Sequence, residues 1–205
     1  MTINNLLLIK KGDVIEENIL NNTPYTFTPT STEPLDCVVL LFNEGVDVTI
    51  DLKEEESSCS IKVLYLANQK DKLNINIRIN HWAYNTKSSQ IIKGIATDES
   101  VVNFNGNIYI DQKAQKTDGS QNHRALLLSD DAFIQSVPAL EIYADDVKCS
   151  HGSATGPLDS GALFYLMSRG ISLKTAKEIL LSSFIADMLP DGYQELTNKW
   201  IETNV

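Results

Sequence analysis

The sequence predicts a mainly β protein that ends in a helical region. Apolar and polar residues alternate along much of the segment from Cys37 to Cys149, as they do in strands with one buried face. After residue 156 the apolar residues recur at helical spacing instead. The composition, with 42% hydrophobic and 21% charged residues, is that of an ordinary globular protein, and 205 residues are enough to bury a core.

The alternating segments follow one another with no helical pattern between them. The first 35 residues carry short apolar pieces, a turn signal at Asn21–Pro24 and a Thr/Pro/Ser-rich tract from Thr26 to Pro34, so we expect an irregular or edge segment there. The predicted strands are, in order, 46–52, 59–66, 73–80, 91–95, 101–110, 125–128 and 140–143.

Such a series of strands can build a sandwich, a barrel or a solenoid. Tight hairpins favour a dipeptide such as Asn-Gly, and Asn105-Gly106, the sole Asn-Gly pair, lies inside an apolar alternation. The apolar clusters recur about every 12 to 19 residues with Asn, Asp and Ser at their ends, which fits the coils of a parallel β-helix. The pattern alone fits a sandwich as well. Gly152–Gly156, a run of small residues, is expected to form a turn.

Capping signals delimit the helices of the C-terminal region. Asp159 has the side chain and position of an N-cap, and Arg169-Gly170 supplies the cation and the glycine typical of a helix end. Ser172 is the predicted N-cap of a second helix, which ends before Pro190. Its expected apolar face consists of Leu173, Ala176, Ile179, Leu180, Ser183, Phe184, Ala186 and Met188.

These signals divide the chain into a β part, residues 1–156, and a helical part, residues 157–205. A weaker third helix is predicted over Tyr193–Glu202. The first two helices are joined by only Gly170-Ile171 and must form a compact hairpin. The apolar faces of this hairpin must cover the β part or meet another protein.

Charge and cysteine content limit the partners and the compartment. The net charge is −10, so the field around the protein repels phosphate and disfavours nucleic acid as a partner. No apolar run approaches the roughly 18 residues that a membrane helix needs. The apolar run at 6–9 is followed, not preceded, by lysines, unlike that of a signal peptide. Three widely spaced cysteines suit reduced thiols, and we expect a cytoplasmic protein without membrane contact.

Few residues are suited to catalysis. The chain has three histidines and lacks the GxSxG, GxxxxGK[ST] and GxGxxG motifs, which disfavours hydrolase, nucleotidase and dehydrogenase activity. In an extended strand, Cys149 and His151 would lie on the same face, where a thiol and an imidazole could share a soft metal or part of an iron–sulfur cluster. A small buried structural thiol is the better interpretation of Cys149 from the residues alone.

One long run in this region carries a family signature. Residues 141–152 (EIYADDVKCSHG), with Ala154-Thr155-Gly156 and the SRGI of 168–171, strongly resemble the C-terminal signature of the SufB/SufD family of iron–sulfur cluster assembly proteins. The resemblance covers about residues 60 to 190 and is greater to the SufD side. It implies a right-handed parallel β-helix (solenoid) with a C-terminal helical hairpin, acting as a scaffold component and not as an enzyme. This chain is short for a SufD-type protein, which implies a short form.

The resemblance also assigns partners and site residues. It implies that a SufB-like subunit pairs with this chain across the β-helices and that a SufC-like ABC ATPase docks on the C-terminal helices. His151 matches the histidine that SufD-like subunits place at the heterodimer interface near the nascent cluster, and Cys149 lies beside it. His123 stands where SufB-like scaffolds carry a key cysteine. The implied ATPase-docking residues are Leu163, Phe164, Tyr165, Arg169 and Gly170.

Because a thiolate is the usual anchor of an iron–sulfur cluster and is replaced here by His123, we expect at most a transient cluster and no stably bound cofactor. Any metal contact would fall to His151 and Cys149. The alternative function is a self-associating β-helix adaptor without a direct role in cluster chemistry. In both cases we expect a homo- or heterodimer, because the edges of a β-helix need cover.

Overall fold

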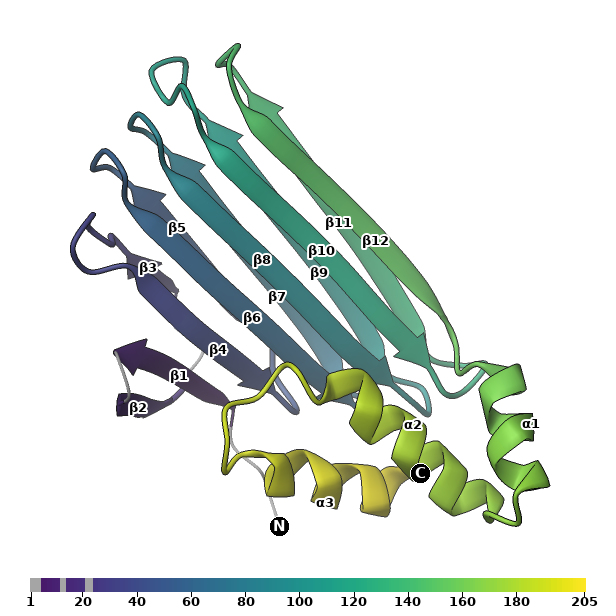
Figure 1. The fold of residues 1–205 in the computed structure, drawn as a ribbon. Helices are drawn as coiled ribbons and strands as arrows, with labels where there is room; N and C mark the ends of the chain where they lie inside the picture. Colours follow the sequence, from purple (N-terminus) through teal and green to yellow (C-terminus); the bar gives the residue numbers. More distant parts are fainter. Residues whose placement is uncertain (1–4, 12–13, 21–23) are drawn as a thin grey trace.

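The protein is a parallel β-solenoid that leads into C-terminal helices (Figure 1). A computed structural model describes residues 5–11, 14–20 and 24–205. Successive strands alternate between two sheets, and about four turns are completed along the chain. This confirms the predicted mainly β solenoid and excludes the sandwich, whose strands would pair antiparallel. The turn signal at Asn21–Pro24 falls largely outside the described residues.

The two sheets face each other across the interior of the solenoid, which we call the lumen. Sheet A consists, in spatial order, of β12 (Lys148–Pro157), β10 (Asp118–Leu127), β8 (Lys87–Ala96), β6 (Ser58–Ala67), β4 (Leu35–Leu41), β1 (Leu6–Lys11) and β2 (Val14–Ile19). Sheet B consists of β11 (Phe133–Ile142), β9 (Val101–Ile110), β7 (Lys72–His81), β5 (Val46–Leu52) and β3 (Tyr25–Phe27). All these pairings are parallel except those that β1 makes with β2 and β4.

Period-two alternation directs every second side chain into the lumen, where the early coils are aliphatic. Residues in register stack in columns along the solenoid. Neighbours in a column are one coil apart in the sequence. The hydrogen-bonded pair Asn80 and Asp51 is separated by 29 positions, and the pair Gln121 and Gln90 by 31. The lumen core is made chiefly of Val39, Leu41, Ile50, Leu52, Ile61, Val63, Tyr65, Ile75, Ile77, Ile79, Ile92 and Phe104.

Polar residues form the corners between the strands. Glu56, Asn85 and Lys116 adopt left-handed backbone conformations with φ of 62°, 55° and 63° at one corner. Their N–H groups reach the next coil, as in the 2.8 Å bond from the Asn85 N–H to the Gln115 carbonyl. Asp98 repeats this conformation at the opposite corner, with a φ of 56°. The same backbone conformation thus recurs at corresponding positions of successive coils, which keeps these coils in register.

Three helices follow the solenoid in the described part of the chain: α1 (Ser160–Ser168), α2 (Leu173–Ile185) and α3 (Gln194–Asn204). The predicted caps are confirmed. The Asp159 carboxylate accepts from the first N–H groups of α1, and the Ser172 hydroxyl accepts from the Thr175 N–H. Gly170 has a φ of +84°, which explains the glycine there. None of the described helices is long and apolar enough to span a membrane.

Helices α2 and α3 pack on the outer face of sheet A, at the C-terminal end of its parallel strands (Figure 1). Lys93 on β8 holds α2 in place, because its ammonium donates to the Phe184 carbonyl at 2.7 Å and pairs with the Asp187 carboxylate. The apolar contact comprises Leu40, Phe42, Leu64, Leu66 and Ile95 from the sheet with Leu181, Ile185, Met188, Trp200 and Ile201 from the helical region.

The predicted apolar face of α2 is partly wrong. The helix buries Ala176, Leu181 and Ile185, whereas Leu173 and Ile179 are 49% and 43% exposed. The segment is apolar on more than one side, so its periodicity alone does not determine which side meets the sheet.

The prediction of a turn at Gly152–Gly156 is also wrong, because this run lies within β12 and pairs with β10 throughout. The small residues were misleading here because β12 is the end strand of sheet A. No described strand lies beyond it, so its side chains do not need to fill an apolar core.

Candidate functional site

The last coil leaves one end of the solenoid open. Strand β12 pairs with β10, and β11 pairs with β9, while no other described strand covers their outer edges. Both strands run along this end of the molecule (Figure 1). Cys149, His151 and Ser153 of β12 are in register with Gly119, Gln121 and His123 of β10, which are the buried, lumen-facing positions of that strand. Since paired parallel residues share a face, Cys149 and His151 lie on the same, lumen-facing side, as the sequence predicted.

His151 is exposed although it faces the lumen, because no described coil lies beyond it. Cys149 is half-buried and unpaired with any other cysteine. Desolvation by burial raises the pKa of the Cys149 thiol, and the nearby Asp118 carboxylate raises it further. The sulfur therefore stays protonated at neutral pH and becomes a strong ligand only when a metal displaces its proton.

His123 occupies a different place. Its imidazole is fully buried, with Nε2 2.9 Å from the Tyr65 hydroxyl and its ring stacked 4.9 Å from that of Phe104. Nδ1 lies 3.2 Å from the Ser153 hydroxyl, which donates to Ser136 at 2.9 Å. Burial lowers the pKa of His123 to about 4, so the ring is neutral. Both ring nitrogens are occupied within the lumen, and the structure does not bring His123 to the exposed side of the open end.

The third histidine, His81, supports a corner. Its Nδ1 lies 2.7 Å from the Thr86 hydroxyl and its Nε2 lies 2.9 Å from the Ser88 hydroxyl. Thr86 in turn contacts Thr117 of the next coil at 3.2 Å. Burial lowers the pKa of His81 to about 4 as well. This histidine therefore has a structural role.

The donor set at the open end is incomplete. In the parts of the chain that the structure describes, no group of three or more His, Cys, Asp or Glu side chains is placed to hold a metal ion. Cys149 and His151 offer one sulfur and one nitrogen on the same side of β12. A protein-bound iron–sulfur cluster usually takes four ligands, most of them thiolates. These two residues alone therefore do not make up the ligand set of a cluster.

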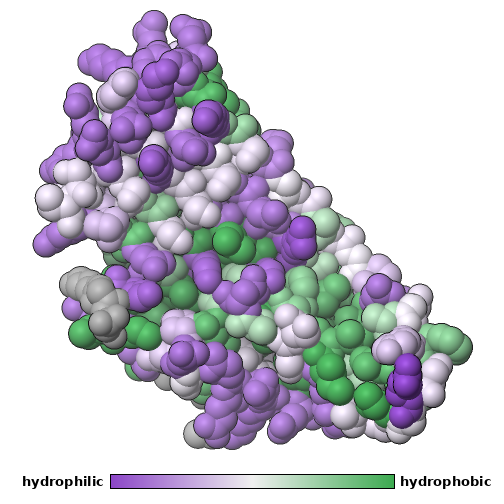
Figure 2. Space-filling view, in the orientation of Figure 1, coloured by the Kyte–Doolittle hydropathy of each residue, from purple (hydrophilic) through white to green (hydrophobic). Residues whose placement is uncertain are grey.

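The residues implied for ATPase docking form a projecting surface. Helix α1 buries none of its residues, and Phe164 and Tyr165 are 74% and 59% exposed, while Leu163 is half-buried. The Arg169 guanidinium lies over the Tyr165 ring, 5.4 Å from its centre, and Gly170 forms the exposed bend to α2. Apolar residues are visible over the helical end of the molecule (Figure 2). We call the exposed residues Phe164, Tyr165, Met167 and Leu173 the hairpin surface.

Sequence reasoning missed the polar lumen of the last coils. Gln90, Gln121, Ser136 and Ser153 join His123 there, although the early coils are aliphatic at the same positions. Alignment of the successive coils could have revealed them. Polar side chains such as Gln121 occupy the positions that point into the lumen in the earlier strands.

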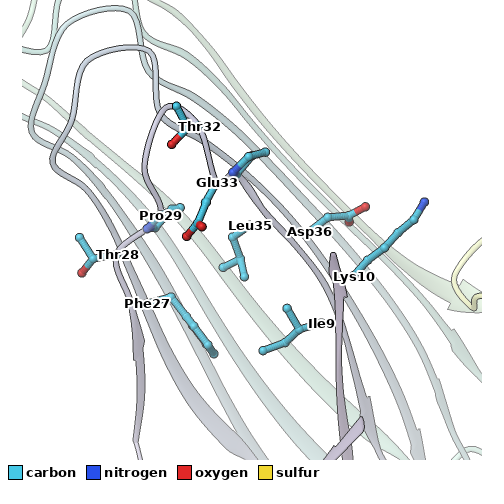
Figure 3. Close-up of a pocket in the computed structure, with 10 residues that line it drawn as sticks. Ile9, Lys10, Phe27, Thr28, Pro29, Thr32, Glu33, Leu35 and Asp36 are labelled. Carbon is cyan, nitrogen blue, oxygen red and sulfur yellow. The ribbon is translucent and has the colours of Figure 1, made fainter. Parts of the chain in front are cut away.

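A cavity of about 640 Å³ lies at the opposite end of the solenoid, next to β1 and β3. Ile9, Phe27 and Leu35 line its floor, with polar side chains around them (Figure 3). None of the site residues predicted from the sequence lines it, so the open C-terminal end remains the candidate site.

Comparison with known proteins agrees with this geometry. Residues 43–184 match the family model described as SUF system FeS cluster assembly, SufBD core domain. Iron-sulfur cluster assembly protein SufD of Escherichia coli K12 is 35% identical over 142 residues, which cover 69% of this chain and 34% of that protein. The SufD of Bacillus subtilis 168 is 28% identical over 152 residues, covering 73% of this chain and 35% of that protein.

A third relative, the chloroplastic protein ABCI7 of Arabidopsis thaliana, is 45% identical over 86 residues, covering 42% of this chain and 18% of that protein. The chain thus spans about a third of the length of the SufD proteins that it matches. The matched residues include the coils from β5 onward, the open end and nearly all of the α1–α2 hairpin. The chain therefore belongs to the SufBD family of iron–sulfur cluster assembly proteins.

Proposed function

We propose that this protein is a non-catalytic scaffold subunit of iron–sulfur cluster assembly. It joins a SufB-like subunit through the open end of its solenoid and a SufC-like ABC ATPase through the hairpin surface. The observation that carries the proposal is that Cys149 and His151 face the lumen yet are accessible at an uncovered edge. The SufD relatives support the assembly role. With two donors of its own, the chain holds no stable cluster until the partner adds the others.

The edge of β12 is suited to pairing with another strand. The Lys148 N–H bonds to the Thr117 carbonyl at 2.8 Å, on the β10 side. Because successive N–H groups of a strand point to opposite sides, those of Cys149, His151, Ser153 and Thr155 point outward. The residues from 152 to 156 have small side chains, so a partner strand can approach closely. Pairing there would satisfy the outward groups and place the partner's ligands beside Cys149 and His151.

Removing one outward-pointing backbone N–H of β12 tests whether a partner strand pairs with this edge. We expect Thr155→Pro to weaken co-purification with a SufB-like subunit at least tenfold, because proline has no N–H and its ring obstructs the edge. The matched control is Thr155→Val, which keeps the N–H and the shape of the side chain. Quantitative pull-down from a co-expression strain measures the effect. Equal capture by the two variants would contradict pairing through this edge.

A second substitution tests the hairpin surface. Phe164 is the most exposed large apolar residue of α1, and a charge there would oppose burial in an interface. We expect Phe164→Asp to reduce binding of a SufC-like ATPase at least tenfold and to leave SufB-like capture unchanged. Val14→Asp is the control, because Val14 is 64% exposed at the other end of the molecule.

The alternative function, a self-associating adaptor, makes a different prediction for the same experiment. The unsubstituted chain would then form a homodimer through β12 that Thr155→Pro dissolves, while neither SufB-like nor SufC-like protein is retained. Light scattering of the purified chain distinguishes the two outcomes.

A further inference from the structure

The two strands at the open end differ in what their free edges offer to another strand. Strand β11 is the last described strand of sheet B and pairs on one side, with β9. The Phe133 N–H donates to the Ser100 carbonyl at 2.9 Å. The N–H of Tyr143, which follows β11, donates to the Ile110 carbonyl at 3.0 Å, also on the β9 side. Because successive backbone groups of a strand point to opposite sides, the even-numbered residues of β11 direct theirs to the free edge.

Pro138 stands at one of these outward positions, in the middle of β11 and in register with Gly106 of β9. A proline has no N–H, so between two strands it would remove a ladder hydrogen bond. Here the missing N–H faces away from β9, and no bond of the sheet is lost. Pro157, the last residue of β12, also points outward, because the Lys148 N–H bonds on the β10 side. Both prolines within the described strands thus lie where they interrupt a free edge and not the sheet.

The side chains of β11 favour association with another chain. Phe133, Val137 and Ile142 are 55%, 45% and 40% exposed. Glu141 is the one charged residue among the ten of the strand. Exposed apolar edge strands with little charge are the ones that pair with other copies and aggregate, and proteins protect such strands with charges, bulges or prolines. In β11 the proline at the centre can serve this purpose.

We propose that Pro138 prevents a second copy of this chain from pairing along β11. It divides the outward N–H groups of the strand into two pairs, Ile134 with Ser136 and Leu140 with Ile142. Its ring keeps the backbone of an approaching strand away from the centre. A copy that paired here through its own opposite end would leave its open end free for the next copy, and such a contact does not close. Strand pairing at the open end is thereby confined to β12, whose only proline is its last residue.

The test is the self-association of Pro138→Val, which restores the outward N–H and places a residue suited to strands at this position. Each protein also carries Thr155→Pro, so that pairing through β12 does not contribute. We expect Pro138→Val to raise the association constant at least about tenfold over the parent chain, measured by sedimentation equilibrium. The matched control is Gln135→Val, which places the same side chain on the exposed outer face of β11 and keeps the proline.

The control should associate no more than the parent chain. The proposal is overturned if Pro138→Val does not associate more strongly than the parent. It is equally overturned if both variants gain to the same extent, because an apolar side chain and not the edge N–H would then be the cause.

Hydrogen exchange of the unsubstituted chain decides the question even if Pro138→Val is insoluble. The outward amides of Ser136 and Leu140 should exchange rapidly, and equally fast at low and at high protein concentration. Protection that grows with concentration would show that β11 pairs despite its proline and would refute the proposal. No SufB-like or SufC-like protein takes part in these measurements, so this inference and the proposed function stand or fall separately.

Discussion

Lowering the pH from 8 to 5 is expected to reduce the free energy of unfolding by about 4 kcal/mol through two histidines, about 2 kcal/mol for each. Burial lowers the pKa of His81 and of His123 from 6.5 to about 4 in the folded protein. The unfolded chain, in which both rings are in water, binds protons near pH 6.5. Between these two values the unfolded state holds more protons than the folded state, so stability falls as the pH falls.

Urea unfolding at intervals from pH 8 to pH 4.5 measures this effect. His81→Asn and His123→Asn should each remove about half of the histidine contribution, and each should also lower stability at pH 8 because hydroxyl partners are lost. For His81 these partners are Thr86 and Ser88, and for His123 they are Tyr65 and Ser153. A pH dependence that stays the same in the double variant would show that the rings are not held neutral in the fold.

Adding a single methyl group at Gly94 is expected to destabilise the protein by about 3 kcal/mol or more. A Cβ at this position would lie 1.8 Å from the ring of Tyr65, which covers the glycine from the neighbouring strand. Tyr65 is fully buried and bonded to His123, so its ring has no space into which to move. We expect Gly94→Ala to unfold at a markedly lower temperature than the unsubstituted protein or to be insoluble.

Gly152→Ala provides the matched control. Gly152 lies in the same sheet, and a Cβ there would have no neighbouring atom within 4 Å. This substitution should change the free energy of unfolding by less than about 0.5 kcal/mol. Combining Gly94→Ala with Tyr65→Leu should recover part of the loss, because the smaller side chain frees the space. If calorimetry gave equal melting temperatures for Gly94→Ala and Gly152→Ala, close packing of the tyrosine on the glycine would be wrong.

Strands with an aliphatic lumen side and a polar outer side could be predicted, whereas β4, which is apolar on both sides, was not among the predicted strands. The segments expected at 46–52 and 101–110 coincide with β5 and β9, since apolar side chains enter the lumen at every second position. Only the end of β10 was expected, because its earlier inward residues are Gly119, Gln121 and His123. A strand that is polar on both faces shows no alternation of hydrophobicity, so this pattern cannot reveal it. The prediction therefore failed in the coils that form the open end.

The candidate site could be predicted in part for a related reason. That Cys149 and His151 share a face follows from their spacing within one strand. The relation of His151 to Gln121, or of His123 to Tyr65, depends on the length of the coils between them. One residue more or less in a corner would change every partner in the column. The spacing of residues within one strand therefore predicted which of them share a face. The sequence did not predict which residues of different coils lie next to each other.

The connection between β12 and α1 has a mechanical consequence. Only Leu158 and Asp159 separate the end of the open strand from the first helix, and Lys93 anchors the next helix to the second strand inward. Helix α2 is fixed to the solenoid, whereas α1 projects from it. Because the connection is so short, a displacement of α1 would directly displace the C-terminal end of β12. The backbone of β12 would be strained first, and the coils farther from the open end would change little.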